Sequence, residues 1–179
     1  MRDTEAMEYS IVYSGPLGRL AIPRTHRACC SLGEGASWCI LGSDSKGFYD
    51  FQHEIYIWKG IKSEDMFAFH FNQKNGRGEV ADKYNRYAHP KQIDYFRKEH
   101  PVLKDIFQQV ESKFITSSQS AFYYALTVMR SRWQEAEPII FSNNKVSKQY
   151  ITYVIGNKFH KYRDGHVLGQ QPLDEVVLS

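Results

Sequence analysis

The segment Met66-Phe67-Ala68-Phe69-His70-Phe71 carries the clearest strand signal in the chain. Successive residues of a strand point to opposite faces, so the three phenylalanines share one face, and Met66, Ala68 and His70 share the other. A face of three phenylalanines needs a second layer of structure to cover it. The segment therefore predicts a sheet with at least one buried face.

The neighbouring segments extend this sheet. Glu54-Ile55-Tyr56-Ile57-Trp58 reads as a strand joined to the first by a polar turn. Further upstream, Ile11–Tyr13 and Leu20–Ile22 flank a Gly/Pro-containing turn and predict a hairpin. We expect a small, mostly antiparallel sheet built from residues near 8 to 71.

The stretch Thr25-His26-Arg27-Ala28-Cys29-Cys30-Ser31-Leu32-Gly33-Glu34-Gly35-Ala36-Ser37-Trp38-Cys39-Ile40 holds all three cysteines. It predicts a short helix with Thr25 as its N-cap and Gly33 as a left-handed stop. A turn then leads into an extended Trp38-Cys39-Ile40. This order places Cys29 and Cys39 within plausible reach of each other.

Downstream of residues 72–79 the patterns become helical. Pro90 and Pro101 each suit the first position of a helix. A third helix is capped at Ser117-Ser118 and ended by Pro138, and its apolar stripe is Phe122, Ala125, Leu126, Met129 and Trp133.

A shift of 26 positions lays Tyr150 on Tyr124 and Val154 on Val128, which indicates two degenerate copies of one helical unit. We predict an α+β protein with a β-rich segment at 1–78 that includes the cysteine helix-turn. A helical segment at 79–179 packs on the sheet and contains the two 26-residue repeats and an irregular tail.

Composition narrows the function classes. The chain is 42% hydrophobic and 24% charged, with a formal net charge of +3. A charge this small does not favour a dedicated nucleic-acid binder. No apolar run is long enough to span a membrane, the start of the chain has no signal-peptide pattern, and three sparse cysteines suit a reducing compartment. We expect a cytoplasmic protein without a membrane partner.

Two segments resemble phage proteins. Residues 13–25 and Leu32-Gly33-Glu34-Gly35-Ala36-Ser37-Trp38-Cys39 resemble uncharacterised tailed-bacteriophage and prophage proteins that carry a Gly-x-Gly-Thr-Lys-Trp-Cys signature, with Ala36 and Ser37 in place of threonine and lysine. Residues 121–138 are similar to a helical repeat of phage and plasmid reading frames, with Gln134 replacing a proline. The resemblance implies a phage origin, and neither family carries an established general activity.

Catalytic chemistry would centre on Cys39. This thiol becomes a nucleophile if His26 or His53 lies within hydrogen-bond reach, as in cysteine hydrolases. The same histidines, with Cys29 or Cys30 and Cys39, have the ligand types of a zinc site, but the chain lacks a Cys-x-x-Cys pair. The simpler interpretation is that the cysteines are small buried apolar residues. We therefore predict no metal and no cofactor.

Binding is the alternative to catalysis, because the chain is 15% aromatic and tyrosine is enriched at recognition surfaces. Residues 83–89 interleave basic and aromatic side chains, which suits nucleic acid but is explained more simply as a solvated flank of the core. The predicted binding residues are the aromatic and basic side chains Trp38, Tyr84, Arg86, Tyr87, Arg130, Arg132 and Trp133.

The favoured hypothesis is a non-enzymatic phage accessory protein. It would bind and modulate, most simply inhibit, a protein of the host cytoplasm such as a defence component. The alternatives are a cysteine- or zinc-dependent enzyme centred on Cys39 and a nucleic-acid-binding protein. The sequence leaves the oligomeric state open.

Overall fold

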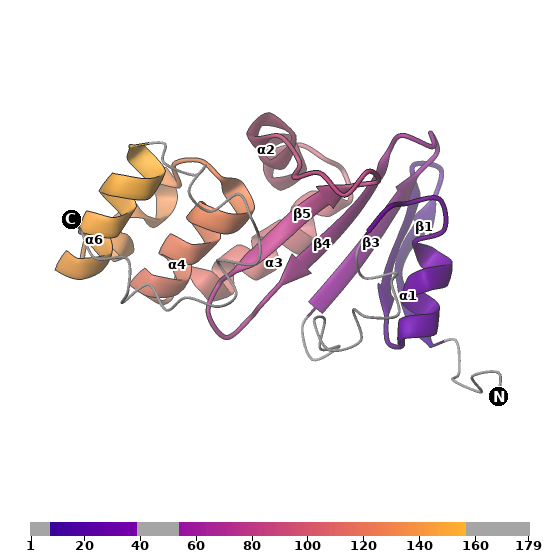
Figure 1. The fold of residues 1–179 in the computed structure, drawn as a ribbon, viewed down its shortest axis with the longest axis horizontal. Helices are drawn as coiled ribbons and strands as arrows, with labels where there is room; N and C mark the ends of the chain where they lie inside the picture. Colours follow the sequence, from indigo (N-terminus) through magenta and orange to yellow (C-terminus); the bar gives the residue numbers. More distant parts are fainter. Residues whose placement is uncertain (1–7, 39–53, 157–179) are drawn as a thin grey trace.

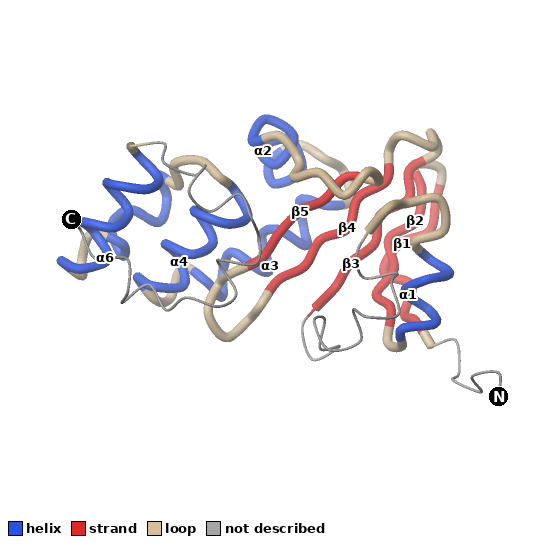
Figure 2. The backbone as a smooth tube through the Cα atoms, in the orientation of Figure 1, coloured by secondary structure: helices blue, strands red, loops and turns tan. Residues whose placement is uncertain are grey.

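A computed structural model describes residues 8–38 and 54–156 of the 179-residue chain. It confirms the α+β class, with an antiparallel sheet in the N-terminal half and helices in the C-terminal half (Figures 1 and 2). The strands are β1 (Tyr9–Gly15), β2 (Gly18–Pro23), β3 (Glu54–Gly60), β4 (Met66–Phe71) and β5 (Gly78–Asp82). The helices are α1 (His26–Leu32), α2 (Pro90–Lys98), α3 (Leu103–Phe114), α4 (Ser118–Tyr124), α5 (Glu137–Ile140) and α6 (Asn144–Tyr150), with π-helical segments η3 (Ala125–Met129) and η5 (Ile151–Ile155) and a 3-10 turn η4 (Gln134–Ala136).

The sheet is a simple meander in which every strand pairs with its neighbours in sequence, in the order β1-β2-β3-β4-β5. Trp58 of β3 lies opposite Leu20 of β2 and Phe67 of β4, so these three side chains share one face. Ile57 lies opposite Ala21 and Ala68 on the other face. Both faces are therefore apolar, and both need cover.

The helices cover the two faces unequally. On one face, the rings of Phe67 and Phe69 in β4 lie 4.9 Å and 5.7 Å from the ring of Phe96 in α2, and Phe69 lies 5.6 Å from Phe107 in α3. On the opposite face, α1 and Trp38 form a smaller core with residues such as Ile57. Figure 1 shows α1 on the side of the sheet away from α3.

The cysteine helix begins as predicted, because the Thr25 side chain accepts a hydrogen bond from the backbone N–H of Ala28 at 3.2 Å. Its end differs. Gly33 has φ −86° and is not left-handed, whereas Gly35 in the following turn has φ +90°. The left-handed residue thus lies two positions later than predicted, within the turn that follows the helix.

The sheet extends past residue 78, so the predicted boundary between 78 and 79 cuts through β5. This strand pairs along β4, although its only buried residues are Val80 and Ala81. Its first residue is tied to η3, since the Gly78 N–H donates to the Thr127 hydroxyl at 3.0 Å. A single aromatic core runs from the sheet into the helices.

The helix that starts at Ser118 is shorter than predicted. It passes into η3 and stops at Met129, where Arg130 takes a left-handed conformation with φ 51°. Trp133 therefore lies in the following connection and not on the helix. Pro138, expected to end this helix, sits in the first turn of α5.

The 26-residue spacing recurs in the structure. The helices α4 and α6 begin at Ser118 and Asn144, and each continues into a π-helical segment. Tyr124 donates a hydrogen bond to Glu111, at 2.8 Å, and Tyr150 donates to Glu137, at 3.2 Å. The two helical units thus share their element order and one polar contact.

Candidate functional site

Two exposed residues of the predicted binding set, Tyr84 and Arg86, lie in the turn between β5 and α2, which we call the Tyr84 loop (Asp82–Arg86). The chain forms a tight hairpin here, because the Asp82 N–H donates to the Arg86 carbonyl at 2.9 Å and the Ala88 N–H donates to the Val80 carbonyl at 2.8 Å. Asn85, with φ 61°, supplies the left-handed residue that a three-residue hairpin loop requires.

The Asp82 carboxylate organises this loop from within. Its Oδ1 accepts hydrogen bonds from the backbone N–H groups of Tyr84 at 2.9 Å and Arg86 at 3.0 Å. Its Oδ2 accepts from the Arg86 guanidinium, with 2.9 Å to Nε. Aspartate is favoured at such a position because its short side chain can reach the N–H groups that follow it.

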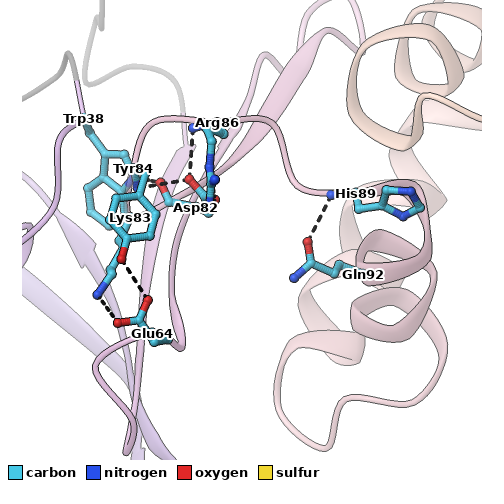
Figure 3. Close-up of polar contacts among 8 residues, drawn as sticks. All are labelled: Trp38, Glu64, Asp82, Lys83, Tyr84, Arg86, His89 and Gln92. Atoms are coloured by element: carbon cyan, nitrogen blue, oxygen red, sulfur yellow. Dashed lines mark hydrogen bonds and ion pairs between the residues drawn. The ribbon is translucent and has the colours of Figure 1, made fainter.

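Two further contacts anchor the loop to distant parts of the chain (Figure 3). The Trp38 indole N–H donates to the Asp82 carbonyl at 2.6 Å, which ties the loop to the segment after α1. Glu64, in the turn between β3 and β4, accepts from the Lys83 ammonium at 2.5 Å and from the Tyr84 hydroxyl at 3.1 Å. The loop is thus held from two sides.

The charges of the loop are matched in opposite pairs. Hydrogen bonds from Lys83 and Tyr84 lower the pKa of Glu64, and the hydrogen bond to Glu64 raises the pKa of Lys83. The hydrogen bond to Asp82 raises the pKa of Arg86. Glu64, Lys83 and Arg86 are therefore charged near neutral pH, and each of the two cations is paired with a carboxylate.

The loop presents an aromatic ring to solvent. Tyr84 is 52% exposed, and its ring centroid lies 4.8 Å from the Arg86 guanidinium carbon and 5.0 Å from the Lys83 ammonium. Cations at these distances are attracted to the ring face. Tyr84 is therefore an exposed ring whose position is fixed by its hydroxyl and by its cationic neighbours.

Three other predicted binding residues, Tyr87, Arg130 and Arg132, form two contacts outside the Tyr84 loop. The Arg130 guanidinium carbon lies 4.9 Å from the centroid of the Tyr87 ring, which brings the end of η3 to the chain just after the Tyr84 loop. Arg132 instead forms an ion pair with Glu137, with 2.5 Å between Nε and Oε1, and this contact raises the pKa of Arg132.

The two tryptophans among the predicted binding residues lie in the core, which corrects their assignment to a binding surface. Trp38 is 4% exposed in the small core beneath α1. Trp133 is 1% exposed, and its ring centroid lies 4.9 Å from that of Tyr124. Both side chains position other elements and are not available to a partner.

The predicted catalytic set is only partly described. Cys39 and His53 lie outside the described residues, whereas His26 is on α1, where both of its ring nitrogens lie 3.8 Å from the Cys30 sulfur. Burial raises the pKa of Cys29 to about 12, so this thiol is not a nucleophile at neutral pH. Within residues 8–38 and 54–156, no group of three or more His, Cys, Asp or Glu side chains could hold a metal ion.

Glu64, Asp82 and Asn85 were not identified from the sequence. The order Asp82-Lys83-Tyr84-Asn85 carries a usable signal, because Asp at the start of a turn and Asn at its left-handed position predict a three-residue hairpin loop. Glu64 has no such signal, since only the folded sheet brings it beside Lys83.

None of the described helices is long and apolar enough to cross a membrane.

Comparison with known proteins yields no relative: no protein-family model, no curated protein and no solved structure matches the chain. The resemblance of residues 13–25, 32–39 and 121–138 to phage proteins therefore stays a prediction. The candidate site is therefore identified from the contacts of its own residues and not from a relative.

Proposed function

We propose that this chain is a non-enzymatic binding protein that engages a partner protein through the Tyr84 loop. One observation carries the proposal: the Tyr84 ring is about half exposed, yet its hydroxyl is held by Glu64 and its ring lies beside Arg86 and Lys83. An exposed aromatic side chain with a defined position needs little further ordering when it meets a partner.

The composition of the loop fits a protein interface. Tyrosine and arginine are the residues most enriched among those that contribute strongly to binding, together with tryptophan. In this loop the Arg86 side chain lies over the Tyr84 ring and is paired with Asp82. A partner would therefore meet an aromatic surface rimmed by polar groups, which is the usual arrangement of an interface centre.

The same pairing disfavours nucleic acid as the ligand. Binding to a phosphate backbone gains its free energy from cations that neutralise phosphates. Lys83 and Arg86 already neutralise Glu64 and Asp82, so a nucleic acid would have to compete with both carboxylates. A protein surface can use the ring and keep these ion pairs intact.

The partner that we propose is a host-cell protein such as a defence component, and the proposed effect is its inhibition. This part of the proposal is supported by the resemblance to phage proteins. A small protein that works by binding alone needs no assembled catalytic group. The proposal therefore expects activity to follow affinity and not thiol chemistry.

The test is a capture experiment with full-length tagged protein expressed in bacteria, followed by mass spectrometry and by titration calorimetry with the purified partner. Tyr84→Ala should weaken the partner's affinity by about 2 kcal/mol or more, which is roughly thirtyfold in the dissociation constant. Asp82→Ala should also weaken binding, because it removes the acceptor that shapes the loop.

Tyr95→Ala is the matched control. Tyr95 is 45% exposed on α2, close to the exposure of Tyr84, but it lies outside the Tyr84 loop. It should leave affinity within experimental error. Equal loss in both variants, or the absence of a stoichiometric partner, would overturn the proposal, and activity abolished by Cys39→Ala with the partner still bound would favour the enzyme alternative.

A further inference from the structure

Two cationic side chains lie next to each other on the face of the sheet that carries α1. Arg19 of β2 lies directly opposite Lys59 of β3, and on its other side Arg19 lies opposite Ser14 of β1. The neighbouring residues Leu20 and Trp58 belong to the aromatic core on the other face. Residues directly opposite in antiparallel strands have Cβ atoms about 4.5–5.5 Å apart. Ser14, Arg19 and Lys59 therefore form one polar row.

The Arg19–Lys59 pair brings two like charges together. Among the residues that the structure describes, neither side chain forms a hydrogen bond or an ion pair. The two carboxylates in the turn after β3, Glu64 and Asp65, already accept hydrogen bonds from other side chains. Like charges directly opposite each other destabilise a sheet. An anion between the two cations would reverse this effect.

The polar row lines a cleft of about 410 Å³ between the first three strands and the end of α1. Figure 2 shows α1 alongside β1 and β2. Six side chains line the cleft: Tyr9, Ser14, Arg19, Ser31, Leu32 and Lys59. Sites for small molecules typically have volumes of about 300–1,000 Å³. The cleft is thus large enough for a small organic ligand.

The polar side chains of this cleft can all donate hydrogen bonds, and none of the lining residues carries a carboxylate. A guanidinium and an ammonium are charged donors, and the serine and tyrosine hydroxyls add neutral ones. A phosphate monoester carries a charge of about −1.5 to −2 near pH 7 and three acceptor oxygens. A carboxylate has one charge and two oxygens, so it would leave one of the cations without a counter-ion. The donor set therefore fits a phosphate group better than a carboxylate.

The end of α1 opposes an anion only weakly. The C-terminus of a helix carries about half a negative charge. In α1 the N–H groups of Gly33 and Glu34 donate to the Cys29 and Ser31 carbonyls, at 2.9 Å and 3.4 Å. Two full positive charges outweigh this partial charge, so the potential in the cleft is positive.

We propose that the cleft binds a small molecule through its phosphate group. The phosphate lies between Arg19 and Lys59 and accepts a hydrogen bond from the Ser14 hydroxyl. Because a phosphate is much smaller than the cleft, the organic part of the ligand lies against Leu32 and against Tyr9, which is 41% exposed. The site shares no residue with the Tyr84 loop and does not rest on the proposed function.

The test is an NMR titration of the full, isotope-labelled chain with inorganic phosphate, adenosine monophosphate and adenosine at constant ionic strength. Adenosine monophosphate is the main probe because it joins a phosphate to an aromatic group. It should shift the backbone amide signals of Ser14, Arg19 and Lys59. Its dissociation constant should be at least about tenfold below that of inorganic phosphate, because its base stacks on Tyr9. Adenosine should leave these signals unchanged.

Charge variants test the two cations. Arg19→Gln and Lys59→Gln should each raise the dissociation constant of adenosine monophosphate at least about tenfold, because each removes a charged donor. Lys59→Gln should also raise the melting temperature of the ligand-free protein, because it ends the repulsion between the cations. Lys62→Gln is the matched control, since it removes the same charge from an exposed position in the turn after β3. It should change neither quantity.

Two further variants separate the parts of the site. Tyr9→Ala should weaken the binding of adenosine monophosphate and leave that of inorganic phosphate unchanged. Ser14→Ala removes only a hydroxyl from an exposed position, so it disturbs folding least. It should raise the dissociation constants of both ligands. Circular dichroism on each variant establishes that it is folded.

Several outcomes would overturn the proposal. They are the absence of amide shifts with adenosine monophosphate, equal losses of affinity in Lys62→Gln and Lys59→Gln, and binding of adenosine as tight as that of its monophosphate. Equal dissociation constants for inorganic phosphate and adenosine monophosphate would indicate an adventitious ion only, and would also overturn it. If the charge variants do not fold, unchanged affinity in Ser14→Ala would overturn the proposal.

Discussion

Tyr150 accepts a hydrogen bond from the backbone N–H of Trp133, with 2.8 Å between the two atoms, although 17 residues separate them in sequence. Both residues are buried, and the Tyr150 hydroxyl also donates to Glu137. The connection between the two helical units is thus fixed by a side chain of the second unit.

Tyr150→Phe should lower the free energy of unfolding by about 2 kcal/mol, because it leaves the buried Trp133 N–H without this acceptor. Tyr124→Phe is the matched control from the first unit. It removes a hydrogen bond to Glu111, whose carboxylate keeps its ion pair with Arg97, so about 1 kcal/mol should be lost. Urea denaturation measures both, and an equal or larger loss for Tyr124→Phe would contradict this account.

Gly76→Ala should destabilise the protein by about 2 kcal/mol or more. Gly76 has φ +78°, and an added Cβ would lie 2.1 Å from the Ser120 carbonyl oxygen at the start of α4. Gly35→Ala separates backbone strain from steric clash, since Gly35 has φ +90° but a Cβ added there would meet no atom within 4 Å. It should cost about 1 kcal/mol from backbone strain alone. Thermal unfolding measures the loss of stability in both variants, and the difference between the two losses is the contribution of the clash.

The stability of the fold should fall in acid through His100. Burial lowers the pKa of this imidazole below its ordinary value of 6.5, and its Nδ1 accepts hydrogen bonds from the N–H groups of Val102 and Leu103. The unfolded chain therefore binds the proton more readily, and the free energy of unfolding should decrease as the pH falls below about 6.5 towards the folded-state pKa. His100→Asn keeps an acceptor without titrating, so urea midpoints should vary less over this range. If the urea midpoint of His100→Asn varied with pH as steeply as that of the wild-type protein, His100 would be ruled out as the cause of the acid sensitivity.

The two adjacent cysteines should react differently with iodoacetamide. Cys29 is 1% exposed with its pKa raised to about 12, chiefly by burial, whereas Cys30 is half-buried beside His26. The reagent needs an accessible thiolate, so Cys30 should be alkylated first and Cys29 only after unfolding. Fragment-ion mass spectrometry assigns the modified residue, and the double variant Cys30→Ser/Cys39→Ser leaves Cys29 as the single thiol. Rapid native labelling of Cys29 would contradict its burial.

Periodicity in the sequence predicted the sheet and most helix starts well. The alternation in β4 indicated its two faces correctly, and the caps at Thr25 and Ser117 were predicted because capping depends on a few adjacent residues. The strand β5 was missed, since Val80 and Ala81 are too short an apolar run to stand out. Its strand conformation depends on pairing with β4.

Other features depend on contacts that no local pattern reveals. The helix after Ser118 ends at Arg130, which adopts a left-handed conformation without being glycine or asparagine. Trp38 and Trp133 resemble exposed binding residues in the sequence but are buried by distant elements. The candidate site was predicted only in part, because Tyr84 and Arg86 are visible in the sequence, whereas Glu64 reaches them through the fold.

The meander order also bears on how the molecule folds. Three of the strand pairs, β1–β2, β3–β4 and β4–β5, are joined by short turns and can form as local hairpins, whereas β2 and β3 pair across the connection that contains α1. The hydrogen bond from Trp38 to Asp82 also closes a long loop, of 44 positions, and its entropy cost places it late in folding. Trp38→Phe removes the donor, and in stopped-flow experiments it should speed unfolding more than it slows refolding. The Tyr84 loop would then be the last part of the β half to gain its native geometry.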